Sequence, residues 1–347
     1  MTPLLRLLVC LYMLAAPAAL AQEDSARFGD GPNRMLVRST TDIRIVRPLI
    51  ERFVEANPDL EVMYEQWGSN ELFANSRAAC DGAAAPADAV FSSAVQHMVW
   101  LVNASCAQAY RSARTAALPD DRRWRDELWG LTEEPAVIVY NKRAINGADV
   151  PRSRFTLLDR MRTEPDALRG RIATYDIQAS GLGYLFAHVD SLEATTFGAM
   201  LEGFSRVEAV ATCCSAEIIA GVAEGRFLIA YNVLGSYVAG ELSPDVGVIL
   251  PEDYTLILSR GYLIPKQARN KEASQRMLDF LLSPEARDIL SEIGLVMAQD
   301  PDETGLLPSA RRLIALSPTL LVALDTNRRA NLLSLWSNAF SSDVADQ

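Results

Sequence analysis

The stretch RMLVRSTTD, residues 34–42, sets a pattern that the rest of the chain repeats. Its first six residues are expected to form a strand, and Thr40-Thr41-Asp42 then opens a helix that reaches about Glu55. The same succession recurs at LEVMYEQ (60–66) before Gly68-Ser69-Asn70, and at ADAVF (87–91) before Ser92-Ser93. Because short apolar strands alternate with amphipathic helices, the sequence predicts an α/β architecture with a largely parallel sheet.

Small polar residues at these strand ends have two interpretations. The first turn of a helix carries unpaired N–H groups and a positive dipole end, which Ser or Thr can cap or a polar ligand can approach. One such loop alone favours simple capping. Three at the carboxyl edge of one sheet favour a binding crevice instead. The candidate wall consists of Thr40, Thr41, Ser69, Asn70, Ser92 and Ser93.

The N-terminal segment MTPLLRLLVCLYMLAAPAALA, residues 1–21, is typical of a secretory signal peptide with cleavage near Ala21. A retained anchor is the alternative, but the apolar run is short and broken by proline. We therefore expect an exported, periplasmic protein with no stable membrane insertion after cleavage. Removing 21 of 347 residues leaves 326, which is more than one core usually serves, so two lobes are expected.

The predicted organisation starts with that signal peptide (1–21). The first lobe comprises 22–136 and the second 137–245. Residues 246–347 then cross back to the first lobe and end in C-terminal helices that complete it.

The net charge of −11 excludes a nucleic-acid partner, because no basic stripe offsets it. Four cysteines remain in the exported part, and four allow three pairings. We favour a disulfide between Cys80 and Cys106, which leaves Cys213-Cys214 as a free pair or a vicinal disulfide. Metal binding by these four is not expected, because neither a CxxC motif nor Cys/His ligand spacing occurs.

Catalytic motifs are missing from the sequence. There is no GxSxG elbow and no phosphate-binding loop, and the only histidines, His97 and His188, stand at positions more typical of packing than of catalysis. Glu133 and Glu134 are adjacent on a predicted strand and point to opposite faces, so they do not form an acid/base pair. We expect no enzyme activity, no catalytic residue and no cofactor.

Five segments together resemble the extracellular solute-binding proteins of ABC importers. They are SSAVQHMVWLV, EPAVIVYNK, ASGLGY, SAEIIAGVAEGRFLIAYNVLGSY and LPEDYTLILSRGYLIPK. Within that family the chain is similar to the branch of ferric-iron, phosphonate and hexose-phosphate binders and the phosphoglycerate transport regulatory protein. The resemblance implies a type II periplasmic-binding-protein fold, in which two hinged α/β lobes close on a solute.

The resemblance also suggests further site residues. The loop at Ser180 and Gly181 matches the loop that holds an anion in such proteins. Iron binders of this branch carry adjacent tyrosines where this chain has Tyr231-Asn232, so direct iron binding is disfavoured, although Tyr231 and Tyr237 remain. Asn232 is expected to face the solute. Arg260 would join it if its side chain faces the cleft rather than solvent.

The sequence therefore predicts a monomeric periplasmic protein that captures a small anionic or phosphorylated organic solute and delivers it to an ABC permease. Two alternatives stay open. One is docking of the closed form on the periplasmic domain of a sensor histidine kinase, and the other is ferric-iron binding.

Overall fold

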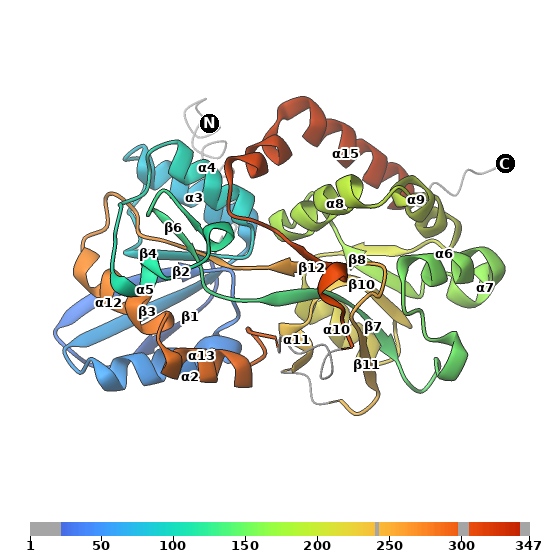
Figure 1. Ribbon diagram of the computed structural model, residues 1–347, viewed down its shortest axis with the longest axis horizontal. Coiled ribbons are helices and arrows are strands. Elements are labelled where there is room, and N and C mark those ends of the chain that lie inside the picture. Colours follow the sequence, from blue (N-terminus) through green and yellow to red (C-terminus); the bar gives the residue numbers. More distant parts are fainter. Residues whose placement is uncertain (1–21, 240–242, 298–304, 341–347) are drawn as a thin grey trace, which may run out of the picture.

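The computed structural model describes residues 22–239, 243–297 and 305–340, which fold into two lobes, each built on a seven-stranded sheet (Figure 1). This confirms the predicted two-lobed α/β architecture. The predicted signal peptide, residues 1–21, lies outside the described residues. Among the described residues, no helix has both the length and the apolar character needed to span a membrane.

The first lobe has the strand order β1-β3-β2-β4-β13-β6-β5. Its parallel centre is β3-β2-β4, while β1, β13, β6 and β5 pair antiparallel. Its elements up to the crossing are β1 (Gln22–Phe28), β2 (Asn33–Ser39), α2 (Ile43–Ala56), β3 (Leu60–Trp67), α3 (Ser69–Cys80), β4 (Ala89–Ser92), α4 (Val95–Asn103), α5 (Ala113–Ala116), η1 (Asp120–Arg122), β5 (Arg123–Trp124) and β6 (Leu128–Gly130).

The second lobe has the strand order β14-β12-β7-β10-β8-β9, with β11 also paired to β7. Its elements are β7 (Glu134–Asn141), η2 (Gly147–Asp149), α6 (Arg154–Thr163), α7 (Pro165–Leu168), β8 (Ile172–Tyr175), α8 (Gly181–Glu193), α9 (Phe197–Arg206), β9 (Val210–Thr212), α10 (Ser215–Ala223), β10 (Ile229–Leu234), α11 (Ser236–Ala239), β11 (Val246–Ile249) and β12 (Thr255–Leu258).

Neither sheet is largely parallel, so that part of the sequence prediction is wrong. Strand β7 pairs antiparallel with β10, β11 and β12, and β13 (Gly261–Leu263) pairs antiparallel with β4 and β6. The reason is the chain path: β7 and β12 run in opposite directions between the lobes (Figure 1). These two crossing strands form the connection about which the lobes can hinge.

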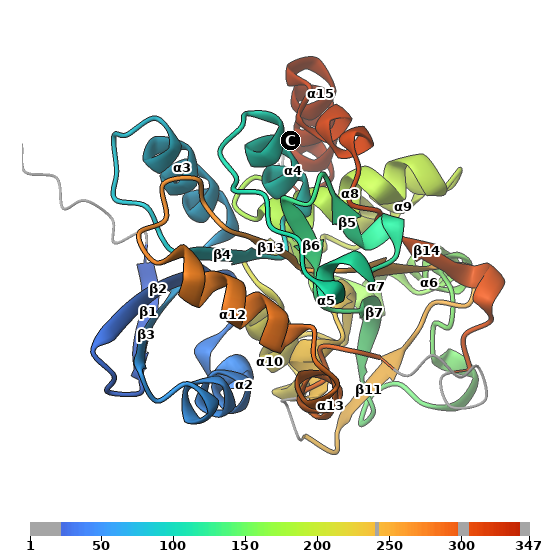
Figure 2. The same cartoon turned by 60° about the vertical axis from the view of Figure 1, so that its left-hand side comes forward.

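The C-terminal part is shared between the lobes. Helices α12 (Lys271–Leu281) and α13 (Pro284–Glu292) belong to the first lobe, where α13 packs on α2 (Figure 2). The chain then passes through η3 (Pro308–Ala310), β14 (Arg311–Leu313) beside β12, and η4 (Pro318–Leu324) against α4.

The last helix, α15 (Thr326–Phe340), differs from the prediction that the C-terminal helices complete the first lobe. It packs on α9 of the second lobe, where the Phe340 ring lies 5.5 Å from that of Phe204 and 4.9 Å from that of Trp336. This position is stabilised by the burial of the aromatic rings of α15 against α9, which removes apolar surface from water.

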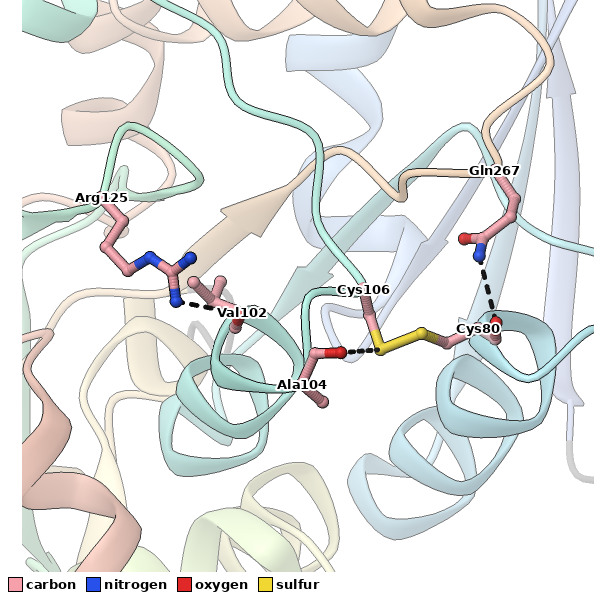
Figure 3. Close-up of a disulfide and its surroundings, with 6 residues drawn as sticks. All are labelled: Cys80, Val102, Ala104, Cys106, Arg125 and Gln267. Carbon is pink, nitrogen blue, oxygen red and sulfur yellow. Dashed lines mark hydrogen bonds between the residues drawn. A yellow bond between two sulfur atoms is a disulfide. The ribbon is translucent and has the colours of Figure 1, made fainter.

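A disulfide joins Cys80, the last residue of α3, to Cys106, which follows α4 (Figure 3). The Gln267 amide donates a hydrogen bond of 3.1 Å to the Cys80 carbonyl (Figure 3). Cys213 and Cys214 are free and exposed. The disulfide thus ties the end of α3 to the segment that follows α4.

Candidate functional site

A cavity of about 350 Å³ lies between the two lobes. Hydroxyl groups line it on both sides, from Thr40, Ser69 and Ser93 of the first lobe and from Ser180 and Ser215 of the second. Each of these residues stands at or just before the start of a helix. Of the six residues predicted from the strand-end loops, Thr40, Ser69 and Ser93 line the cavity. Ser180, which the family resemblance suggested, lines it as well, while Ser215 was not among the predicted residues.

Two helices point uncapped first turns at this cavity. Helix α3 begins after Gly68 and α10 after Cys214, and neither preceding residue makes a side-chain cap hydrogen bond. Helix α8 is different, because the Ser180 hydroxyl accepts a hydrogen bond of 3.0 Å from Gly183 N–H. The first turns of α3 and α10 can thus offer backbone donors to a ligand.

Hydrogen bonds join the lobes along one edge of the cleft. Gly181 N–H donates to the Ser69 hydroxyl over 2.8 Å, and the Asn70 amide donates to the carbonyl of Ala179 over 2.8 Å. The Gln96 amide donates to the Gly181 carbonyl over 2.7 Å. Asn70 and Gly181 therefore hold the two lobes together at this edge rather than lining the cavity, because their polar groups are used in the contact.

The hydroxyls of the first lobe are themselves partly engaged. Ser93 N–H donates to Thr40 Oγ1 over 2.9 Å, and the two side-chain oxygens lie 3.1 Å apart. Ser92 is buried behind them, and its hydroxyl accepts from Ala94 N–H over 3.2 Å. Thr40 and Ser93 remain on the cavity wall, whereas Ser92 supports the backbone turn beneath it.

Arg260 does not face the cleft, contrary to the expectation that it could bind the solute. Its guanidinium is 0% exposed and makes a two-pronged ion pair with Glu134, at 2.7 Å from Nε and 2.9 Å from Nη2. Nη1 donates to the Thr41 hydroxyl over 2.8 Å, which also places Thr41 in this cluster instead of on the wall. Burial alone would lower the pKa of Arg260. The Glu134 carboxylate raises it by a larger amount, so the pKa of Arg260 lies above the ordinary arginine value.

This ion pair stands where the chain crosses between the lobes. Glu134 is the first residue of β7, and Arg260 directly precedes β13. The Glu134 carboxylate also accepts hydrogen bonds from Thr132, at 2.7 Å, and from Ser236 of α11, at 2.6 Å. The buried Glu134 carboxylate therefore accepts hydrogen bonds from residues of both lobes at the hinge.

Tyr231 and Asn232 also lie away from the cavity. Strand β10 does not end at Ala230 but continues to Leu234, with a bulge against β7 between Ala230 and Val233. Asn232 adopts the left-handed conformation at this bulge (φ 55°), which asparagine tolerates better than most residues. Neither Tyr231 nor Asn232 lines the cavity, so the expectation that Asn232 faces the solute is not met by this geometry.

The bulge turns both side chains into a buried polar cluster of the second lobe. Asp190 accepts from the Tyr231 hydroxyl over 2.7 Å and from the Asn232 amide over 2.6 Å. Arg154 donates to both residues, at 2.8 Å and 3.3 Å, and pairs with Asp190 at 3.2 Å. Arg154 is 1% exposed, so the carboxylate neutralises a charge that would otherwise be isolated in the core.

Several residues that sequence reasoning missed line the cavity. Among its described lining residues are three carboxylates, Glu23, Asp42 and Glu217, but no lysine or arginine. Tyr237 lies on the wall with its hydroxyl donating to Asp42 over 2.9 Å, and burial raises the pKa of Tyr237 well above its usual value. The start of α10 repeats the strand-to-helix signal, but the preceding β9 has only three residues and gives a weak pattern.

The free cysteines stand at the edge of the same cavity. Cys213, Cys214 and Glu217 each present a potential ligand atom, and these atoms lie within 4.8 Å of one another. Sequence reasoning set these cysteines aside for want of a CxxC motif, and it did not weigh the carboxylate three residues downstream. Glu23 of the first lobe lines the same cavity.

His97 is a packed residue. Its ring stacks on Phe73 at a centroid distance of 4.3 Å, and burial lowers the pKa of His97 to about 3. Its Nδ1 has no hydrogen-bond partner among the described residues. A histidine that stays neutral in this environment is a structural element of α4.

The matched family and solved structures agree with this geometry. The family model of the bacterial extracellular solute-binding proteins matches residues 37–296. The substrate-binding protein of an ABC transporter from Agrobacterium tumefaciens is 32% identical, with a TM-score of 0.84 over 92% of this chain and 98% of that chain. No match to a curated protein sequence was found.

Two more distant structures share the fold. The apo ferric ion-binding protein A of Pasteurella haemolytica is 17% identical, with a TM-score of 0.69 over 90% of this chain and 100% of that one. The periplasmic binding protein AfuA of Actinobacillus pleuropneumoniae, solved with fructose-6-phosphate, is 15% identical, with a TM-score of 0.69 over 89% and 99%.

Proposed function

The chain belongs to the bacterial extracellular solute-binding proteins of ABC transporters, and we propose that it captures a small organic solute bearing an anionic group in the cavity between its lobes. It delivers this solute to an ABC permease after the lobes close around it. It acts in the periplasm and performs no chemistry on the solute.

The single observation that carries the proposal is the convergence of uncapped helix starts on the interlobe cavity. Gly68 and Cys214 precede α3 and α10 without a side-chain cap, and both line the cavity. Backbone N–H groups in a first turn stabilise a phosphate or carboxylate without needing a basic side chain. The hydroxyls of Thr40 and Ser93 add neutral donors from the first lobe.

The charge of the cavity narrows the class of solute. Since Glu23, Asp42 and Glu217 line it, a solute with several negative charges would meet repulsion. Hydroxyl or ammonium groups of a solute could instead donate hydrogen bonds to these carboxylates. A solute with one anionic end and a hydroxylated or aminated end therefore fits better than a dense polyanion.

Ferric iron fits the cavity less well. Tyr231 is buried and bonded to Asp190, and the Tyr237 hydroxyl donates to Asp42. Burial raises the pKa of both phenols well above the usual value, which opposes the tyrosinate form that iron requires. The phenols of this chain are thus arranged as hydrogen-bond donors.

The experiment is a thermal-shift screen of phosphorylated sugars, phosphonates, amino acids, dicarboxylates and Fe³⁺, followed by calorimetric titration of the solute that raises the melting temperature. Replacing Ser93→Ala should weaken binding of that solute about tenfold, equivalent to about 1.4 kcal/mol. The matched control Ser205→Ala changes an exposed serine on α9 and should bind normally. Binding of Fe³⁺ alone with a visible absorption band would contradict the proposal.

A further inference from the structure

The cluster of Cys213, Cys214 and Glu217 has a composition that solute binding does not explain. Two thiols precede α10 and a carboxylate stands in its first turn, with the potential ligand atoms within 4.8 Å of one another. All three side chains are exposed at the cavity edge. A single cation at their centre would thus contact every one of them.

The ligand set points to a particular class of metal. Thiolate sulfur binds Zn²⁺ and other thiophilic cations strongly, while a carboxylate oxygen completes many zinc sites. Three protein ligands leave a fourth tetrahedral position open. Mg²⁺ and Ca²⁺ prefer sets made of oxygen alone, so they are poor occupants here.

A second carboxylate near the cluster comes from the opposite lobe. Glu23 of β1 lines the same cavity as Cys213, Cys214 and Glu217. The Gln66 amide donates to one of its oxygens, Oε2, over 3.0 Å. Glu23 therefore adds negative charge on the first-lobe side of the cavity that the cluster borders.

The charge around the cluster favours a cation. No lysine or arginine is found among the described residues that line the cavity, and Asp42 adds a further carboxylate. Like charges repel one another. Asp42 is already paired with Arg44 at 3.6 Å, so Glu23 and Glu217 are the carboxylates that a bound cation would stabilise. A bound cation would also lower the repulsion that an anionic solute meets in the cleft.

We propose that Cys213, Cys214 and Glu217 bind a thiophilic divalent cation such as Zn²⁺ at the second-lobe edge of the cleft. This site extends the protein beyond capture of an organic solute. Its test uses the metal alone and needs no organic solute.

The experiment uses the full exported chain, kept reduced with a phosphine and stripped of metal. Zn²⁺ is titrated in competition with a chromophoric chelator, and Co²⁺ is titrated to detect the thiolate-to-cobalt charge-transfer band. We expect one metal per chain, a weaker band in Cys213→Ser and in Cys214→Ser, no band when both cysteines are replaced, and affinity weakened about tenfold or more in Glu217→Gln. The control Glu224→Gln changes an exposed carboxylate at the other end of α10 and should bind as the wild type does.

A second measurement needs no variant. Zn²⁺ should protect both free thiols of the wild type from alkylation, and the protection should disappear on chelation. Unchanged alkylation in the presence of Zn²⁺ would overturn the proposal. So would a cobalt band of wild-type intensity in Cys214→Ser, an equal loss of affinity in Glu224→Gln, or recovery of Cys213-Cys214 as a disulfide from cells grown with ample zinc.

Discussion

Replacement of Arg260 by methionine tests the assignment of this residue to the hinge rather than to the solute. The Glu134 carboxylate is 0% exposed and has four polar contacts, two of them from Arg260. Removing the guanidinium leaves a buried charge with only the Thr132 and Ser236 hydroxyls as donors. Breaking a buried pair in this way costs about 3–5 kcal/mol, and the two remaining donors place the expected loss near 3 kcal/mol.

The assay is urea denaturation followed by circular dichroism at pH 7, without solute. Arg260→Met should lower the free energy of unfolding by about 3 kcal/mol with an unchanged m value. Adding Glu134→Gln to that variant should recover part of the loss, because the unpaired charge is then gone. A loss below about 1 kcal/mol, together with lost solute affinity, would refute the reasoning and make Arg260 a ligand-binding residue.

Three further predictions concern stability. Asn232→Ala removes hydrogen bonds to Asp190 and Arg154 and should lower the free energy of unfolding by about 2 kcal/mol, with solute affinity unchanged in calorimetry; the reverse result would return Asn232 to the binding site. Because burial lowers the pKa of His97 to about 3, the unfolded chain binds the extra proton as pH falls below about 6.5. Phenylalanine cannot take up this proton. The free energy of unfolding of His97→Phe minus that of wild type, measured by urea titration, should therefore rise by roughly 3 kcal/mol as pH falls from 7 to 4. The same pH dependence of stability in both proteins would contradict this. Replacing both Cys80 and Cys106 by serine opens a loop with a sequence separation of 26 and should cost about 3.5 kcal/mol; a change within error in the melting experiment would show that the disulfide is dispensable.

The parts of the site that could be predicted from sequence are those governed by local rules. Thr40, Ser69 and Ser93 reach the cavity because each follows a strand at the point where a helix begins. That relation depends on neighbouring residues alone. The two-lobed α/β fold could be predicted for the same reason, because short apolar strands and amphipathic helices alternate along the sequence.

Arg260 and Asn232 could not be assigned in that way. A polar side chain after an apolar strand can face a ligand or enter a buried polar cluster, and its partner decides which. Glu134 is separated from Arg260 by 126 positions, and Asp190 from Asn232 by 42. A single sequence does not reveal such distant pairings.

The parallel sheet failed as a prediction for a related reason. Strand direction depends on where the chain goes between strands, and the crossing of β7 and β12 between the lobes reverses it. Helix α15 was likewise misplaced, since only the contact of Trp336 and Phe340 with Phe204 shows which lobe it covers.

The central claim is that a solute occupies the cavity between the lobes, and blocking that cavity tests it most directly. Ala216 lines the cavity in the first turn of α10, whereas Ala220 lies one turn further along the same helix and does not line it. Calorimetric titration of the solute from the screen should show no binding to Ala216→Trp and wild-type affinity for Ala220→Trp. Full binding by Ala216→Trp would place the solute elsewhere and contradict the account.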